Sequence, residues 1–135
     1  MNGQNDWLEL FTSATGRLSR TPFLVASAFL LILAFIYEVV TGDTLKLLTG
    51  WIAYPALLFF AANLLAKRLH DRGRSGWWTA IIILAIMMVW PFPHRLFDAL
   101  GVVVVIWAVV ELGMLPGEQG ANRYGPNPAR VAQPA

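Results

Sequence analysis

The most informative pattern in this chain is a short polar segment between two long stretches without a charged residue. Residues 47–66 and 75–93 contain no Asp, Glu, Lys or Arg, whereas residues 67–74 read Lys-Arg-Leu-His-Asp-Arg-Gly-Arg. A helix on the surface of a water-soluble protein keeps one face polar, so it does not show this contrast. A helical hairpin in a membrane does, because its spans must be apolar and its turn reaches water. The pattern therefore predicts two membrane-spanning helices joined by a polar segment at the surface.

Four apolar stretches approach the length needed to cross the hydrocarbon core of a bilayer, which takes about 20 mostly apolar residues. We predict spans at approximately residues 22–40, 47–66, 77–92 and 96–115. Composition agrees, since 57% of the residues are hydrophobic and 13% are charged, against roughly 25% charged in soluble domains. The predicted fold class is all-α, an integral membrane bundle of four transmembrane helices.

The distribution of positive charge predicts the orientation of this bundle. Of the ten Lys and Arg residues, only Lys46 and Arg95 fall in the connections on one side of the predicted membrane. The positive-inside rule therefore places the other side, with both termini and residues 67–74, in the cytoplasm. Topology alone explains the basic residues, so nucleic acid is not a predicted partner.

The spans divide the chain into three parts. Residues 1–21 are a predicted cytoplasmic amphipathic segment, in which Trp7, Leu10 and Phe11 fall at helical spacing. Residues 22–115 form the transmembrane domain, and residues 116–135, rich in Gly and Pro, form a predicted irregular cytoplasmic tail. The first 20 residues lack an apolar core, so a cleaved secretory signal is not expected. The absence of cysteine excludes disulfides and thiolate metal sites.

The polar segment is expected to begin as a continuation of the second helix. Gly73 is a suitable end for that helix, because glycine readily adopts the left-handed cap conformation. The connection to the third helix is then only a few residues long, with Ser75 able to cap the third helix. The second and third helices are therefore predicted to be antiparallel neighbours.

Three separated motifs resemble those of a bacterial membrane protein family called domain of unknown function 805. The N-terminal motif is Gly-Arg-Leu-Ser-Arg-Thr-Pro-Phe at residues 16–23, and the central motif is Arg-Leu-His-Asp-Arg-Gly-Arg-Ser-Gly-Trp-Trp at residues 68–78. The tail motif, residues 117–128, contains Asn-Arg-Tyr-Gly. Leu24 departs from the family pattern, which usually has Trp at this position. The resemblance implies a small multi-pass protein of the bacterial inner membrane, and it implies no established activity.

The three motifs supply the candidate functional surface, because all are predicted to lie at the cytoplasmic face. The candidate residues for binding a protein partner or lipid are Arg17, Arg20, Lys67, Arg68, His70, Asp71, Arg72, Arg74, Trp77, Trp78, Asn122, Arg123 and Tyr124. Basic side chains at the inner leaflet can hold anionic lipid headgroups, each contributing about 1 kcal/mol. The alternative is that they only determine topology.

Asp71 is expected to neutralise the cations around it. Lys67 lies four residues away, and Arg68 and Arg74 each lie three residues away, which are the spacings of neighbours on a helix. We also expect the tail motif to fold back onto the central motif, with Asp71 pairing to Arg123.

Polar side chains within the predicted spans lie near the membrane surfaces. Glu38, Asp98 and Glu111 are close to the ends of their helices, so each can bend toward water or headgroups. Glu111 is expected to pair with the basic central motif, and Asn63 to form an interhelical hydrogen bond. No polar stripe runs through a span, which argues against an ion path.

Catalysis is the least favoured class of function. His70 and Asp71 are adjacent, so they cannot face each other on a helix, and no nucleophile or second base accompanies them. His94 is predicted on the opposite side of the membrane, so no catalytic, metal or cofactor site is predicted. The sequence favours a non-enzymatic membrane module that binds a protein partner, a second copy of itself or anionic lipid through its basic cytoplasmic face. The alternative is a subunit of an oligomeric transporter or channel.

Overall fold

The computed structural model describes residues 7–131, and the regular elements in this part of the chain are helices and one antiparallel bridge between Asn122 and Gly125. The elements are α1 (Trp7–Thr12), α2 (Arg20–Val40), α3 (Asp43–Asp71), α4 (Trp78–Val89), α5 (Asp98–Ala108), the π-helix η1 (Val109–Met114) and α6 (Pro128–Val131). The prediction of an all-α fold is confirmed. The predictions for residues 1–6 and 132–135 lie outside the described residues.

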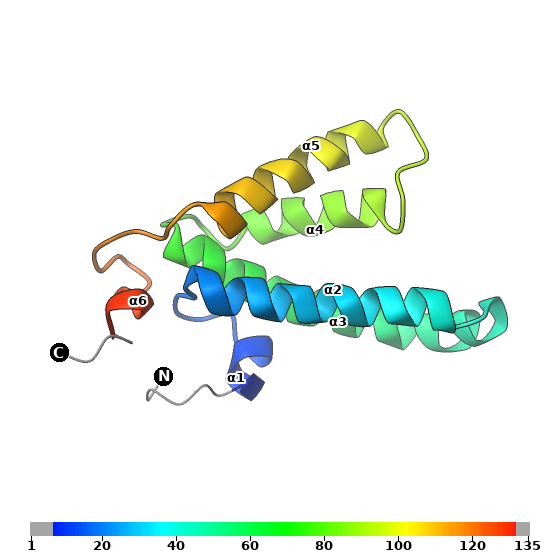
Figure 1. Cartoon of the computed structure of the whole chain (residues 1–135), viewed down its shortest axis with the longest axis horizontal. Coiled ribbons are helices and arrows are strands. Elements are labelled where there is room, and N and C mark those ends of the chain that lie inside the picture. Colours follow the sequence, from blue (N-terminus) through cyan, green and yellow to red (C-terminus); the bar gives the residue numbers. More distant parts are fainter. Residues whose placement is uncertain (1–6, 132–135) are drawn as a thin grey trace.

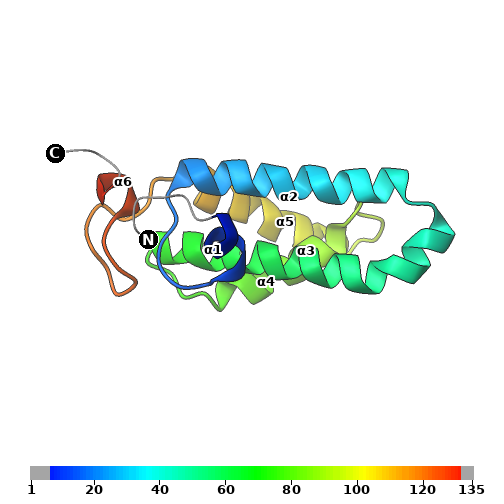
Figure 2. The ribbon, with the colours of Figure 1, turned by 90° about the horizontal axis from the view of Figure 1, so that it is seen from below.

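The helices form two hairpins that meet at one end (Figure 1). One hairpin is made of α2 and α3, and the other of α4 and α5 continued by η1. The hairpins come together where α3 ends and α4 begins, which we call the joined end. They diverge toward the turns at residues 41–42 and 90–97, which we call the open end. Figures 1 and 2 place α1 and α6 toward the joined end.

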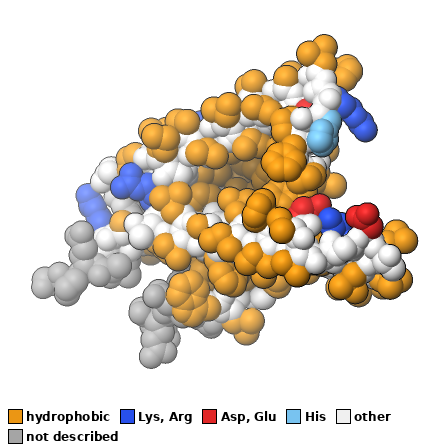
Figure 3. Space-filling model, turned by 45° about the vertical axis from the view of Figure 1, so that its right-hand side comes forward, with side chains coloured by type: hydrophobic (Ala, Val, Ile, Leu, Met, Phe, Trp, Pro, Cys, Tyr) orange, Lys and Arg blue, Asp and Glu red, His pale blue; other side chains and the backbone are white. Residues whose placement is uncertain are grey.

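Two of the helices, α2 with 21 residues and α3 with 29, are long and apolar enough to cross a membrane. Only 17% of the most apolar window of each helix is buried inside the protein, so most of this apolar surface faces outward. Figure 3 shows hydrophobic side chains over both hairpins and in the hollow between them. Water-soluble monomers rarely expose contiguous apolar surface on this scale. The structure therefore supports membrane association through α2 and α3.

The predicted helix boundaries hold at the central motif and shift elsewhere. As predicted, α3 continues to Asp71, and Gly73 follows in the left-handed conformation with φ +71°. The next helix, α4, begins at Trp78 and packs against α3. The prediction of an irregular tail is wrong for Pro128–Val131, where a proline at the first helical position starts α6.

The fourth predicted span is not a continuous α-helix. Its α-helical part, α5, gives way at Val109 to η1, and the Leu115 N–H donates to the Val110 carbonyl five residues earlier, at 3.1 Å. The wider π turn places Glu111 and Leu112 inside the protein. π-Helical turns are often found at functional sites, because they redirect side chains and free carbonyl groups for other partners.

The buried apolar residues are concentrated toward the joined end. They include Leu18, Phe23, Leu64, Leu69 and Leu112, which come from the N-terminal segment, α2, α3 and η1. α1 packs against α3, and the Asn63 side-chain amide donates to the Phe11 carbonyl at 2.8 Å. The predicted interhelical hydrogen bond of Asn63 is confirmed, with α1 as the partner helix. The core thus holds the elements that carry the three motifs.

Candidate functional site

The joined end brings the three sequence motifs into contact through their backbones. The Leu18 N–H donates to the Lys67 carbonyl at 3.2 Å, which fixes the N-terminal motif against the end of α3. The Glu118 N–H donates to the Asp71 carbonyl at 2.8 Å, which fixes the tail motif at the same place. The tail then stays close to α3, since the Asn122 side-chain amide donates to the His70 carbonyl at 2.9 Å.

Beneath the tail lies an ion cluster made of Arg17, Arg68 and Asp71, which we call the buried cluster. Arg17 Nε lies 3.0 Å from Asp71 Oδ1, and Arg68 Nη1 donates to Asp71 Oδ2. The three side chains are 1%, 0% and 3% exposed. Buried charges are tolerated when they are paired and hydrogen-bonded, and here one carboxylate is shared by two guanidinium groups. This cluster therefore depends on Asp71.

Arg17 connects the carboxylate to the tail. Its Nη1 donates to the carbonyls of Gly120 at 2.7 Å and Gly125 at 3.2 Å, and its Nη2 donates to the Glu118 carbonyl at 2.7 Å. A planar guanidinium can meet several acceptors in a fixed geometry, which a lysine ammonium on its flexible stem does not reproduce. The tail segment from Glu118 to Gly125 is thus ordered around one side chain.

Arg68 makes the corresponding connection to η1. Its Nε donates to the Leu112 carbonyl at 2.7 Å and its Nη2 to the Leu115 carbonyl at 2.6 Å. These carbonyls lie at the end of the π-helix, where backbone acceptors are left without intrahelical partners. Lys67 acts in the same way on α1, because its Nζ donates to the carbonyl of Glu9 at 2.7 Å.

Two glycines are required where the tail passes the end of α3. A Cβ atom on Gly117 would collide with the Asp71 carboxylate, and one on Gly73 would collide with the Glu118 carboxylate. Gly73 also has the positive φ that other residues rarely adopt. These contacts explain why the residue at position 73 of the central motif and the residue at position 117 of the tail motif are both glycine.

The tail folds back onto the central motif as predicted, but the predicted ion pair is wrong. The Tyr124 ring stacks on the His70 ring, with centroids 3.8 Å apart and planes 8° from parallel. Arg123 is exposed and its guanidinium lies over the Tyr124 ring at 4.8 Å, while Asp71 is buried under the tail. Arg17 of the N-terminal motif, and not Arg123 of the tail, is therefore the second arginine that pairs with Asp71.

The predicted pairs of Asp71 with Lys67 and Arg74 are also not formed. Lys67 donates instead to carbonyls of α1, and Arg74 turns to Glu111. Of the three neighbours expected from helical spacing, only Arg68 pairs with Asp71. Spacing predicted which cations were near, and tertiary contacts decided which one binds.

His70 is held between the N-terminal motif and the tail. It lies four residues beyond the predicted span at residues 47–66. Its Nδ1 is 3.0 Å from the Gly16 carbonyl oxygen, which accepts a hydrogen bond from the ring N–H. Burial lowers the pKa of His70 below its usual value, which favours the neutral form that stacks on Tyr124.

A second ion group, which we call the surface cluster, consists of Arg72, Arg74 and Glu111. Arg72 Nη2 and Arg74 Nε lie 3.0 and 2.8 Å from the same oxygen, Glu111 Oε1. The predicted pairing of Glu111 with the central motif is confirmed. The Arg74 guanidinium also lies over the rings of Trp78, at 6.0 Å, and Trp107, at 5.7 Å. Unlike the buried cluster, this group reaches solvent, since the Arg74 side chain is 40% exposed.

The thirteen residues predicted as a binding face fall into three groups. Four are buried: Arg17, Lys67, Arg68 and Asp71. Four are exposed: Arg20, Trp77, Trp78 and Arg123. Five are half-buried: His70, Arg72, Arg74, Asn122 and Tyr124. Part of the predicted binding face is therefore buried, and these buried residues support the exposed ones.

Sequence reasoning missed two contributors to the joined end. Trp107, on α5, forms one of the two rings under Arg74, and Glu118 contributes its backbone N–H and carbonyl to the buried cluster. No periodic pattern marks either residue, because Trp107 lies in an apolar helix and Glu118 reaches the buried cluster through its main chain. Only the position of Glu118 inside the tail motif was a possible signal.

The open end contains a separate polar group between α2 and α3. Lys46 Nζ lies 2.9 Å from Glu38 Oε1, and the Tyr54 hydroxyl donates to Glu38 Oε2. The Tyr37 and Thr49 hydroxyls are 2.8 Å apart. Glu38 therefore joins the two helices near their turn.

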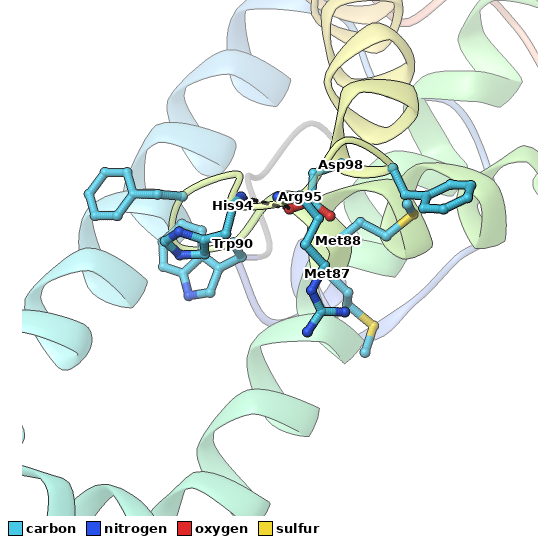
Figure 4. A pocket seen from close by; sticks show the side chains of 8 residues that line it. Met87, Met88, Trp90, His94, Arg95 and Asp98 are labelled. Carbon is cyan, nitrogen blue, oxygen red and sulfur yellow. Dashed lines mark hydrogen bonds between the residues drawn. The ribbon is translucent and has the colours of Figure 1, made fainter.

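A cavity of about 540 Å³ lies at the open end of the second hairpin. Its lining residues are Met87, Met88, Trp90, Phe92, His94, Arg95, Phe97 and Asp98. Figure 4 shows Trp90 and His94 on one side of it, and Met87, Met88 and Arg95 on the other. Asp98 Oδ2 accepts the N–H groups of His94 at 2.7 Å and Arg95 at 2.8 Å, which orders the turn just before α5. This cavity is separate from the three motifs.

The fold and the joined end define a class: a helical protein with two helices long and apolar enough to cross a membrane, in which three sequence motifs close over a buried arginine–aspartate cluster. A family model described as "Protein of unknown function (DUF805)" matches residues 11–126. The chain belongs to this family. The matched range contains the N-terminal and central motifs, the tail motif up to residue 126 and every residue of the buried and surface clusters, so these contacts lie inside the family domain.

Relatives of the chain are known in Escherichia coli. "Uncharacterized protein YiiR" of strain K12 and the protein of the same name in strain O157:H7 are each 28% identical to it over 130 residues. The alignment covers 88% of this chain and 86% of each relative. No solved structure matches the chain.

Proposed function

We propose that the chain is a multi-pass protein of the bacterial inner membrane, with four apolar segments crossing the bilayer and the joined end in the cytoplasm. The support for the second hairpin is its outward apolar surface, which includes Leu84 at 60% and Val103 at 64% exposure. The 12 residues of α4 extend about 18 Å against a hydrocarbon core of about 30 Å. To cross the bilayer, this hairpin therefore needs the apolar residues that flank α4 on both sides and local thinning of the bilayer.

At the joined end, the protein acts as a non-enzymatic binding module for anionic lipid or a protein partner. One observation carries this proposal: the buried cluster holds the tail and the ends of α3 and η1 in one fixed arrangement. The exposed cations and indoles of the same end, among them Arg20, Trp77 and Arg123, therefore stand on an ordered support. A preorganised surface binds with less loss of conformational entropy.

The ionisable groups at the joined end favour binding over catalysis. Both oxygens of Asp71 are engaged by arginines, and Glu111 accepts from Arg72 and Arg74. His70 is occupied by the Gly16 carbonyl and the Tyr124 ring. A general acid or base needs a free site that faces its substrate, and within the protein Asp71 uses both of its oxygens, Glu111 its Oε1 and His70 its Nδ1.

The geometry gives less support to the transporter or channel alternative. Seven of the eight buried polar residues among the described ones lie toward the joined end: Arg17, Asn63, Lys67, Arg68, Asp71, Thr79 and Glu111. The eighth, Asp98, accepts backbone N–H groups of the turn before α5 at the open end. A conduction path requires polar groups between these ends, so the binding module is the function that we favour.

Photocrosslinking in living cells tests the binding module. A photoreactive amino acid replaces Trp77, which is 85% exposed at the joined end, and in a control chain it replaces Leu96, which is 90% exposed at the open end. The proposal predicts a defined adduct, with lipid or with one protein, at position 77 and not at position 96. Equal, diffuse adducts at both positions would contradict it, because they would show that the joined end has no specific occupant.

A further inference from the structure

We propose that the surface cluster is a binding site for the phosphate group of an anionic phospholipid, with Arg74 as the residue that contacts it. This inference rests on the proposed function and gives the module a particular ligand. A lipid headgroup and a free phosphate ion both present phosphate oxygens, which arginine recognises through its forked N–H donors.

The charge of the cluster leaves room for one anion. Arg72 and Arg74 carry two positive charges, and Glu111 supplies one negative charge to both. A single phosphodiester, with one negative charge, would complete the balance. The buried cluster differs, because both arginines there are enclosed by Asp71 and by backbone carbonyls.

The free hydrogen-bonding capacity of the cluster lies on Arg74. Arg74 Nε is used by Glu111, whereas its two terminal nitrogens make no hydrogen bond to residues 7–131. Arg72 has less to offer, because its Nη1 donates to the Pro116 carbonyl at 2.5 Å and its Nε and Nη2 donate to Glu111. A ligand at this site would therefore meet the outer edge of the Arg74 guanidinium.

The surroundings of Arg74 favour a lipid over a protein or a soluble anion. Its guanidinium lies over the rings of Trp78 and Trp107, within cation–π distance of both. The neighbouring surface of α4 and α5 is apolar, with Ile81 47% and Ile106 58% exposed. Indoles that join a polar and an apolar surface typically lie at the headgroup level of a bilayer. A cation held at that level meets lipid phosphates first.

Native mass spectrometry of the full chain, released from mixed micelles with equal phosphatidylglycerol and phosphatidylcholine, tests the site. We expect the wild-type protein to retain phosphatidylglycerol in preference, and Arg74→Gln to reduce that retention roughly five- to tenfold. Arg74→Lys should fall between them, because it keeps the charge and loses the fork. Arg130→Gln is the matched control, since it removes one exposed positive charge from the same end, outside the cluster.

Three results would overturn the proposal. Wild-type retention in Arg74→Gln would show that the cluster does not hold the lipid. An equal loss in Arg130→Gln would show that only net charge matters. Displacement of the lipid by millimolar inorganic phosphate would assign the site to a soluble anion. If the site fails in this way and the position 77 adduct persists, the binding module stands with a different ligand; if the adduct is also absent, both proposals fail.

Discussion

Replacing Asp71 by asparagine should lower the free energy of unfolding by about 3–5 kcal/mol, because it removes the counterion of two buried guanidinium groups. The side chains of Arg17 and Arg68 are 1% and 0% exposed, so neither can regain water without opening the joined end. An asparagine amide would also place N–H donors against guanidinium donors. Thermal unfolding of the purified protein in one detergent, followed by circular dichroism or intrinsic fluorescence, measures the change.

Asp43→Asn is the matched control for this substitution. It makes the same chemical change at an exposed position in the first turn of α3. We expect a loss below about 1 kcal/mol there, the usual size of a charge–helix-dipole interaction at the surface. Equal effects of the two substitutions would contradict the structural role of the buried cluster.

Replacing Arg17 by glutamine should release the tail while the hairpins remain folded. Asp71 keeps Arg68 as its partner in this variant, but the carbonyls of Glu118, Gly120 and Gly125 lose the donors that order them. Hydrogen bonds from a charged donor contribute about 1.5–3 kcal/mol each, so the open tail should become at least about tenfold more populated. Cleavage after Glu118 by a glutamate-specific protease, in nanodiscs, measures this opening.

Arg123→Gln is the control for tail release. It removes one arginine from the tail motif itself and leaves the Glu118 cleavage site intact. Because Arg123 is exposed and its guanidinium lies over the Tyr124 ring, away from the buried cluster, its loss should change the cleavage rate less than about twofold. Faster cleavage in Arg123→Gln than in Arg17→Gln would restore the pairing expected from sequence and contradict the one in the structure.

The apolar pattern predicted the helices well because the constraint behind it is strong. Hydrocarbon permits few backbone arrangements besides the helix, so long uncharged stretches give the class directly. The end of α3 near Gly73 was also predictable, since a local rule links glycine to the left-handed cap. The π-helix at Val109–Met114 was not, because it depends on contacts that residues distant in sequence, above all Arg68, make with its carbonyls.

The site was predicted as a set of residues more accurately than as a set of contacts. The motifs identified the residues that meet at the joined end, and charge complementarity identified Glu111 as a partner of the central motif. The choice between Arg17 and Arg123 as the second partner of Asp71 required the path of the chain, which no spacing rule supplies. The burial of these side chains could not be predicted either. A basic residue in a polar motif, such as Arg68, is expected at the surface, and only its three-dimensional neighbours show that it is buried.

Single-cysteine labelling in intact cells is the most direct test of the central claim that four apolar segments cross the membrane with the joined end inside. The chain has no cysteine of its own, so each introduced thiol reports one position. A membrane-impermeant maleimide should label Asp43→Cys and Leu96→Cys from the periplasm, and Gln119→Cys only after the inner membrane is permeabilised. Protection of Leu96→Cys together with Gln119→Cys would show that the second hairpin does not cross, and labelling of Gln119→Cys in intact cells would place the joined end on the wrong side.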